Sequence, residues 1–125
     1  IYDTQRRSRG SNAPELRCQL VSWWENDAVA ALSRQYFGGS EGSHATASEI
    51  AVTQHAFPDQ IKRAVLEPKV APSGGFHDAR DFRRRYPDGR IGSDPSLASP
   101  EKGKALMDAA VGAIAETYRR FVAAD

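Results

Sequence analysis

A histidine in a glycine- and serine-rich turn, followed at once by a helix start, is the feature of this sequence best suited to chemistry. Residues 42–54 read GSHATASEIAVTQ. Thr46 and Glu49 have the spacing of a capping box, in which the hydroxyl accepts from the Glu49 amide and the carboxylate accepts from the Thr46 amide. His44 is therefore predicted to lie just before the first helical turn, where free amides and the positive end of the helix dipole face outward. A histidine placed there suits general acid or base catalysis.

Simpler interpretations of both residues stay open. His44 can be a turn histidine whose ring bonds a nearby backbone group. Glu49 can serve as a helix cap and nothing more, or it can also orient His44 or a metal ligand.

Capping and hydrophobic periodicity predict the elements that position this turn. Residues 15–23 alternate as a strand buried on both faces, and Asn26 caps a helix that ends at Gly38. A second helix is expected over residues 47–56, with Pro58 after it, and extended chain over residues 61–72.

The second half of the chain has a long irregular segment and one long helix. Residues 73–99 are rich in Gly, Pro, Asp and Arg and are predicted to be a functional loop or packing arm, with a short helix over residues 78–86. Ser99 and Pro100 start the last helix. Its apolar stripe is Leu106, Ala110, Ile114, Tyr118 and Phe121, and we expect Leu106, Ile114 and Phe121 to be buried.

Length and charge limit the possible classes of protein. The chain has 125 residues, enough for one domain, and 17 Lys plus Arg against 16 Asp plus Glu, for a net charge of +1. That balance argues against nucleic acid as a partner. Cys18 is predicted to be a buried thiol in a reducing compartment, and we find neither a membrane-spanning run nor a signal peptide. The prediction is a cytoplasmic protein without a membrane partner.

Three blocks of the sequence resemble the creatininase family of metal-dependent amidohydrolases. His44 and Glu49 have the spacing of the family motif H-x-G-x-x-E-T-S, although Ala47 and Ala51 depart from it. The stretch LVSWWEN, residues 20–26, is similar to a family strand that ends in an aromatic residue near the metal site. The stretch GRIGSDPSLASPEKGKALMDAAV, residues 89–111, resembles a segment that leads into the C-terminal helix.

This resemblance implies a fold, a site and a reaction. The fold would be a three-layer α/β/α domain with a mostly parallel sheet. The site would hold two zinc or manganese ions and hydrolyse a small cyclic amide or formamide-type substrate. His44 would donate a proton to the leaving nitrogen, Glu49 would assist, and Trp24 and Ser43 would contact substrate. Homo-oligomers, commonly hexamers, would be expected.

The family's metal-ligand motifs are the missing part. They precede the histidine motif, and neither occurs among residues 1–125, whose three histidines are His44, His55 and His77. We therefore assign no metal ligand in this chain. The expectation is that residues 1–125 form the C-terminal part of one creatininase-like domain, and that an N-terminal half or a partner chain supplies the ligands.

Other features allow alternatives. Trp24 can be a pocket wall or, with Trp23, ordinary packing. Ser40 stands where creatinine hydrolases have a second tryptophan, which argues against creatinine as substrate. The arginines in residues 80–90 can clamp a phosphate or carboxylate or bind nucleic acid, but we favour a solvated or subunit-interface surface, because nearby aspartates can pair with them. The alternative function is a non-catalytic creatininase-like subunit or assembly domain.

Overall fold

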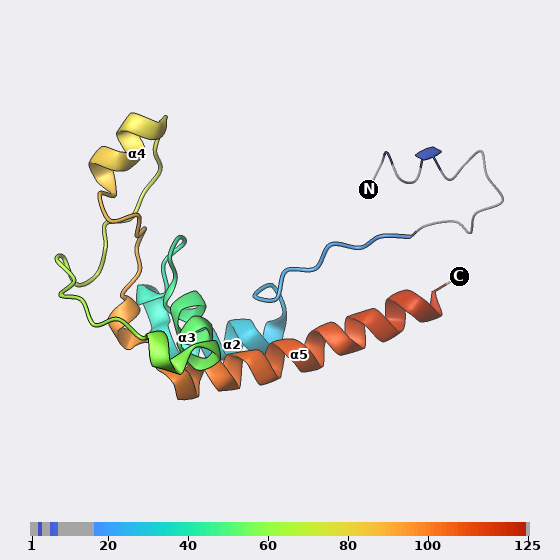
Figure 1. The fold of residues 1–125 in the computed structure, drawn as a ribbon. Helices are drawn as coiled ribbons and strands as arrows, with labels where there is room; N and C mark the ends of the chain where they lie inside the picture. The colour runs from blue at the N-terminus through green and yellow to red at the C-terminus, as the bar shows by residue number, and fades with distance from the viewer. Residues whose placement is uncertain (1–2, 4–5, 8–16, 125) are drawn as a thin grey trace.

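The computed structural model describes residues 3, 6–7 and 17–124. Its helices are α2 (Asp27–Phe37), α3 (Ala47–Ala56), α4 (Ala79–Arg85) and α5 (Pro100–Ala123), with 3₁₀ turns at Gly38–Ser40, Pro58–Gln60 and Pro95–Leu97. In Figure 1, α2, α3 and the first half of α5 form one body, and the second half of α5 extends beyond it. Helix α4 lies apart from that body, at the end of two extended stretches. We call residues 74–90 the α4 arm.

Helices α2, α3 and α5 follow the residues that the sequence predicted as their caps. The Asn26 side chain accepts from the Val29 amide at 2.9 Å, and the Ser99 hydroxyl accepts from the Lys102 amide at 3.3 Å. The capping box at Thr46 is present, and the Asp78 carboxylate caps α4. Side-chain caps of this kind stabilise a helix by about 1 kcal/mol each, so the helix boundaries are set locally.

The core lies where α3 and α2 pack on the first half of α5. Gly103 of α5 sits against the backbone of α3, because a Cβ built on it would lie 1.9 Å from the Ala51 carbonyl oxygen. Leu106, one helical turn further along, has no exposed surface, as the sequence predicted. The buried cluster consists of Val29, Phe37, Ala47, Ala51, Leu106 and Ala110. Small residues at the crossing therefore allow close contact between the two backbones.

The three-layer α/β/α fold with a parallel sheet is wrong for the described residues. They form helices and no strand, and the one backbone bridge is antiparallel, between His44 and Ile91. Residues 17–22 of the predicted strand have no regular secondary structure. Leu20 is 91% exposed, because no described element packs over its side chain. Residues 15–16 of that strand lie outside the described part.

Two burial predictions fail for the same reason. Cys18 is exposed, and Ile114 is 38% exposed. Cys18 lies in the irregular stretch at residues 17–22, and Ile114 lies on the second half of α5. Both are beyond the body, where no other described helix covers them. Phe121 is half-buried, with the Arg17 guanidinium 5.1 Å from its ring centre. Among the helices of the described part, none has the length and apolar character needed to cross a membrane.

Candidate functional site

The turn that carries His44 is fixed by backbone contacts with residues 91–93. The Ser43 amide donates to the Ile91 carbonyl at 2.9 Å, and the Ile91 amide donates to the His44 carbonyl at 3.2 Å. Gly42 has φ +82°, and a Cβ there would lie 2.6 Å from the Ile91 carbonyl oxygen. Glycine is required at this position because the left-handed conformation and the close contact both exclude a side chain.

The start of α3 uses both nearby glutamates. The Thr46 amide donates to Glu49 Oε2 at 2.9 Å, and the Glu49 amide donates to Thr46 Oγ1 at 3.2 Å. Glu41 binds Ser48 in the first turn of α3, since its carboxylate accepts from the Ser48 amide at 3.2 Å and from the Ser48 hydroxyl. The cap role of Glu49 is therefore confirmed, and its carboxylate already has two donors from Thr46.

A pocket of about 450 Å³ lies between α2, the Trp23–Trp24 turn and the start of α3. Three of the residues predicted for the site line it: Trp24, Ser43 and Glu49. The Trp24 ring meets that of Trp23 edge to face, with centres 5.8 Å apart. Trp24 is also 54% exposed, so it is not simply core. The volume falls within the roughly 300–1,000 Å³ typical of small-molecule sites.

His44 is exposed and does not line this pocket. Its ring lies edge to face with Phe82 of α4, with centres 6.2 Å apart and planes at 73°. His44 thus lies in an exposed turn and not beside a sheet, because the described residues form no sheet, and its ring does not face the pocket.

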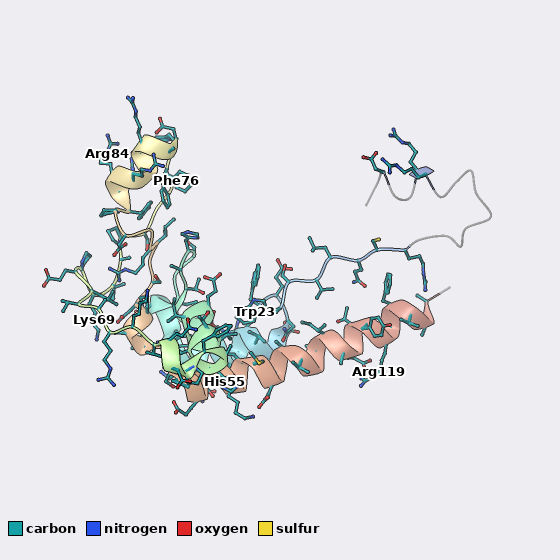
Figure 2. The ribbon with its side chains drawn as sticks, viewed as in Figure 1. Trp23, His55, Lys69, Phe76, Arg84 and Arg119 are labelled. Atoms are coloured by element: carbon teal, nitrogen blue, oxygen red, sulfur yellow. The ribbon has the colours of Figure 1, made fainter. Side chains whose placement is uncertain are left out.

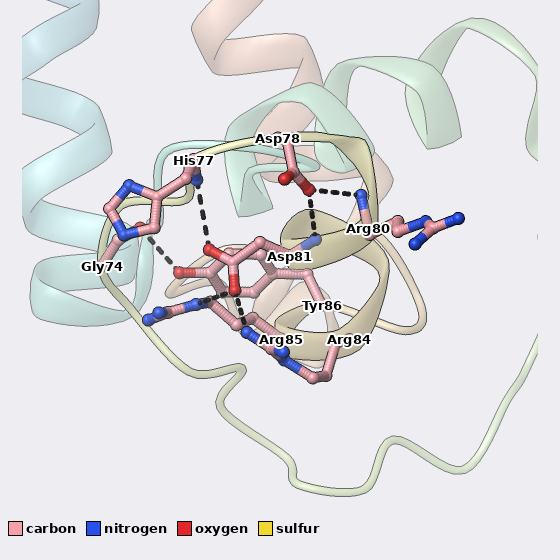
Figure 3. A network of polar contacts seen from close by, with 8 residues as sticks. All are labelled: Gly74, His77, Asp78, Arg80, Asp81, Arg84, Arg85 and Tyr86. Atoms are coloured by element: carbon pink, nitrogen blue, oxygen red, sulfur yellow. Dashed lines mark hydrogen bonds and ion pairs between the residues drawn. The ribbon is translucent and has the colours of Figure 1, made fainter.

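The α4 arm carries a polar network around Asp81 (Figure 3). Its carboxylate accepts from Arg85 Nε at 2.8 Å, from Arg84 and from the His77 amide at 3.1 Å. The hydrogen bond from Arg85 is the largest cause that lowers the Asp81 pKa, to about 2. Tyr86, which is buried, donates its hydroxyl to the Gly74 carbonyl at 2.6 Å.

The arginines of residues 80–90 do not form one anion clamp. Arg84 and Arg85 pair with Asp81, as predicted for the neighbouring aspartates. Arg90 is 4% exposed and pairs with Asp88, while its other nitrogens donate to the carbonyls of Pro68 and Lys69 at 2.8 Å. Arg90 therefore joins the base of the arm to the preceding loop.

Some residues of the site were missed by the sequence analysis. Arg34 and Glu41 line the pocket, and Phe82 contacts the His44 ring. Arg34 stands on the polar side of an amphipathic helix, and Phe82 lies some forty residues from His44. Neither had a sequence signal. Glu41 did have one, because an acid shortly before a helix start is a possible partner for its amides.

The sequence that forms this site matches a known protein family. The family model described as "Creatininase: Creatinine amidohydrolase" matches residues 2–118. The chain belongs to the creatininase family. No curated protein sequence matches it. Creatininase membership indicates an amidohydrolase type of function, and the members generally depend on metal.

The creatininase metal centre does not fit the side chains of the described part. Residues 3, 6–7 and 17–124 hold no group of three or more His, Cys, Asp or Glu side chains placed to bind one ion. His55 lies in the last turn of α3, and His77 precedes α4 (Figures 2 and 3). A closed coordination shell needs several convergent ligands, and these histidines are on separate elements.

Proposed function

We propose that this creatininase-family chain takes part in hydrolysis of a small cyclic amide or formamide-type substrate. The observation that carries the proposal is the pocket. It is lined by Trp24, Ser43 and Glu49, for which the family resemblance predicts a site role, and Ser43 directly precedes His44 in the chain. Its tryptophans offer apolar faces for a small planar compound.

In this proposal His44 donates a proton to the nitrogen that leaves when the amide bond breaks. An amine is a poor leaving group without that proton, and a positioned histidine supplies it near neutral pH. Ser43 and Trp24 contact the substrate, and Glu49 holds the start of α3 that fixes the turn. Zinc or manganese ligands would come mainly from an N-terminal half or a partner chain, and we assign the described residues no metal step.

Two variants in the complete enzyme test these roles. His44→Ala should lower turnover of formanilide or hydantoin, as formamide and cyclic-amide probes, by about a hundred- to ten-thousandfold, while circular dichroism stays unchanged. Glu49→Gln should change the free energy of unfolding by about 1 kcal/mol or less, because glutamine also serves in a capping box. A much larger loss of activity in Glu49→Gln would assign its carboxylate to the site as well.

Full amide hydrolysis by His44→Ala would contradict the proton-transfer role. Absence of amide hydrolysis from the wild-type protein would instead favour the alternative proposal, a non-catalytic creatininase-like subunit. Two observations support that alternative: the His44 ring lies outside the pocket, and the Glu49 carboxylate is bound by Thr46.

Assembly and location are also proposals. We propose a homo-oligomer, with a hexamer as the first form to test by light scattering after size-exclusion chromatography. The exposed apolar side chains on the second half of α5, including Ile114, Tyr118 and Val122, support a further contact there. The location proposed is the cytoplasm.

A further inference from the structure

His44 has a fixed backbone and a largely free side chain. The exchange of hydrogen bonds with Ile91 holds its main chain, and the Ser93 hydroxyl donates to its carbonyl at 3.4 Å. Ala45, the next residue, has φ +50°, a left-handed conformation that is uncommon outside glycine. The ring itself is exposed. These backbone contacts therefore do not determine the direction of the His44 ring.

Phe82 of α4 supplies the ring contact recorded for His44 in the described part of the chain. The distance of 6.2 Å between ring centres and the angle of 73° are those of an attractive edge-to-face pair. A contact of this kind favours one orientation of the imidazole over the others, which would point into solvent.

Phe82 is held in turn by the rest of the arm. Its ring packs on Phe76, with centres 5.0 Å apart, and on Tyr86, with centres 5.6 Å apart. Tyr86 is buried and bonded to the Gly74 carbonyl. The arm thus carries its own small aromatic cluster, which fixes the place of Phe82.

The base of the arm is also hydrogen-bonded to residues 91–93, the strip that holds His44. The Ala71 amide donates to the Ser93 carbonyl at 3.0 Å, and the Gly92 amide donates to the Pro72 carbonyl at 2.9 Å. Residues 91–93 therefore contact both the His44 turn and the chain that leads into the arm. Phe82 and His44 are positioned from the same strip.

We propose that Phe82 is a positioning residue that sets the orientation of the His44 ring, so that the α4 arm controls proton transfer by His44. This inference depends on the proposed catalytic role of His44. A general acid must lie within hydrogen-bond reach of the atom it protonates, and small misplacements of a catalytic group reduce the rate. Phe82 itself touches neither substrate nor reacting atoms.

The ring contact is measured first by NMR on the complete protein with labelled histidine. The His44 ring protons should show a cross-peak to Phe82, because the two rings are in contact. The ring current of Phe82 also shifts the resonances of protons near it. Phe82→Leu should move the His44 ring signals toward those of a solvent-exposed histidine. Phe82→Tyr should retain the wild-type signals, because the ring is kept. Phe57→Leu is the matched control, since Phe57 is 57% exposed at the end of α3.

The kinetic measurement separates positioning from binding. Phe82→Leu should lower kcat about tenfold with little change in KM, and Phe82→Tyr should restore it. If Phe82→Leu fails to fold, Phe82→Met keeps the apolar volume without the ring and takes its place.

Three results would contradict the positioning role of Phe82. His44 signals that are identical in wild type and Phe82→Leu overturn the inference. So does an unchanged kcat in Phe82→Leu when His44→Ala has lost its activity, and in that case the proposed function stands. Unchanged turnover in His44→Ala overturns the proton-transfer role of His44, and the positioning role with it.

Discussion

Asp81 is the single side chain on which most ion pairs of the α4 arm depend. It accepts from Arg85, from Arg84 and from the His77 amide, and only 6% of its surface is exposed. These donors favour the ionised carboxylate, so its pKa falls from the ordinary 3.8 to about 2. Protonation would leave two guanidinium groups without their partner.

The sign of the resulting pH dependence follows from that lowered pKa. The stabilisation by Asp81 is fully present above about pH 3.8 and is lost as pH falls through about 2. Protection of the α4 amides from hydrogen exchange, relative to the intrinsic exchange rate at each pH, should therefore fall between pH 4 and pH 2 in wild type. Asp81→Asn should already exchange faster at pH 5 and should lack this acid-dependent step. Equal acid dependence in the two proteins would assign the change to another carboxyl.

Close contact of α3 and α5 is the main packing feature at the scale of elements, and it depends on Gly103. A methyl group there would overlap the Ala51 carbonyl. We expect Gly103→Ala to lower the free energy of unfolding by about 3 kcal/mol or more, since the helices must separate to admit the side chain. Chemical denaturation monitored by circular dichroism measures the change.

Gly112 in the same helix provides the matched control. A Cβ on Gly112 meets no atom within 4 Å, so Gly112→Ala should instead stabilise the protein by about 0.5–1 kcal/mol through helix propensity. Destabilisation of similar size in both variants would show that the α3–α5 contact is not the cause.

The elements that the sequence predicts correctly are those with local causes. Asn26, Thr46 and Ser99 each bond an amide three residues later, so their helices are encoded within one turn. A sheet cannot be predicted from local signals alone, because it also depends on pairing between strands that are distant in the sequence. The alternation in residues 17–22 favours a strand, but a strand forms only when another strand pairs with its backbone, and no described segment does so.

The same distinction applies to the candidate site. Trp24, Ser43 and Glu49 were predicted from motifs and do meet at one pocket. The direction of the His44 ring was not predictable, because it depends on Phe82, which reaches the turn only through the strip at residues 91–93. Long-range contacts of single side chains leave no periodic signal in a sequence.

At the scale of the whole molecule, the histidines are distributed rather than gathered. His44 lies in the turn before α3, His55 in its last turn and His77 before α4. Carboxylates near them already have partners: Glu49 is bound in the cap, and Asp81 is bound by arginines. The side chains that could ligate a metal thus belong to three separate local structures.

This distribution leads to a prediction about metal binding by the 125-residue chain. Tight zinc binding requires about four convergent ligands, and one histidine with one or two carboxylates does not provide them. We expect zinc and manganese to bind chelator-treated protein at pH 7 with dissociation constants of about micromolar or weaker, as measured by titration calorimetry. His44→Ala should leave these constants nearly unchanged. Stoichiometric tight binding by the chain without any partner would instead show that it holds a complete ligand set, and the proposal that residues elsewhere supply the ligands would be wrong.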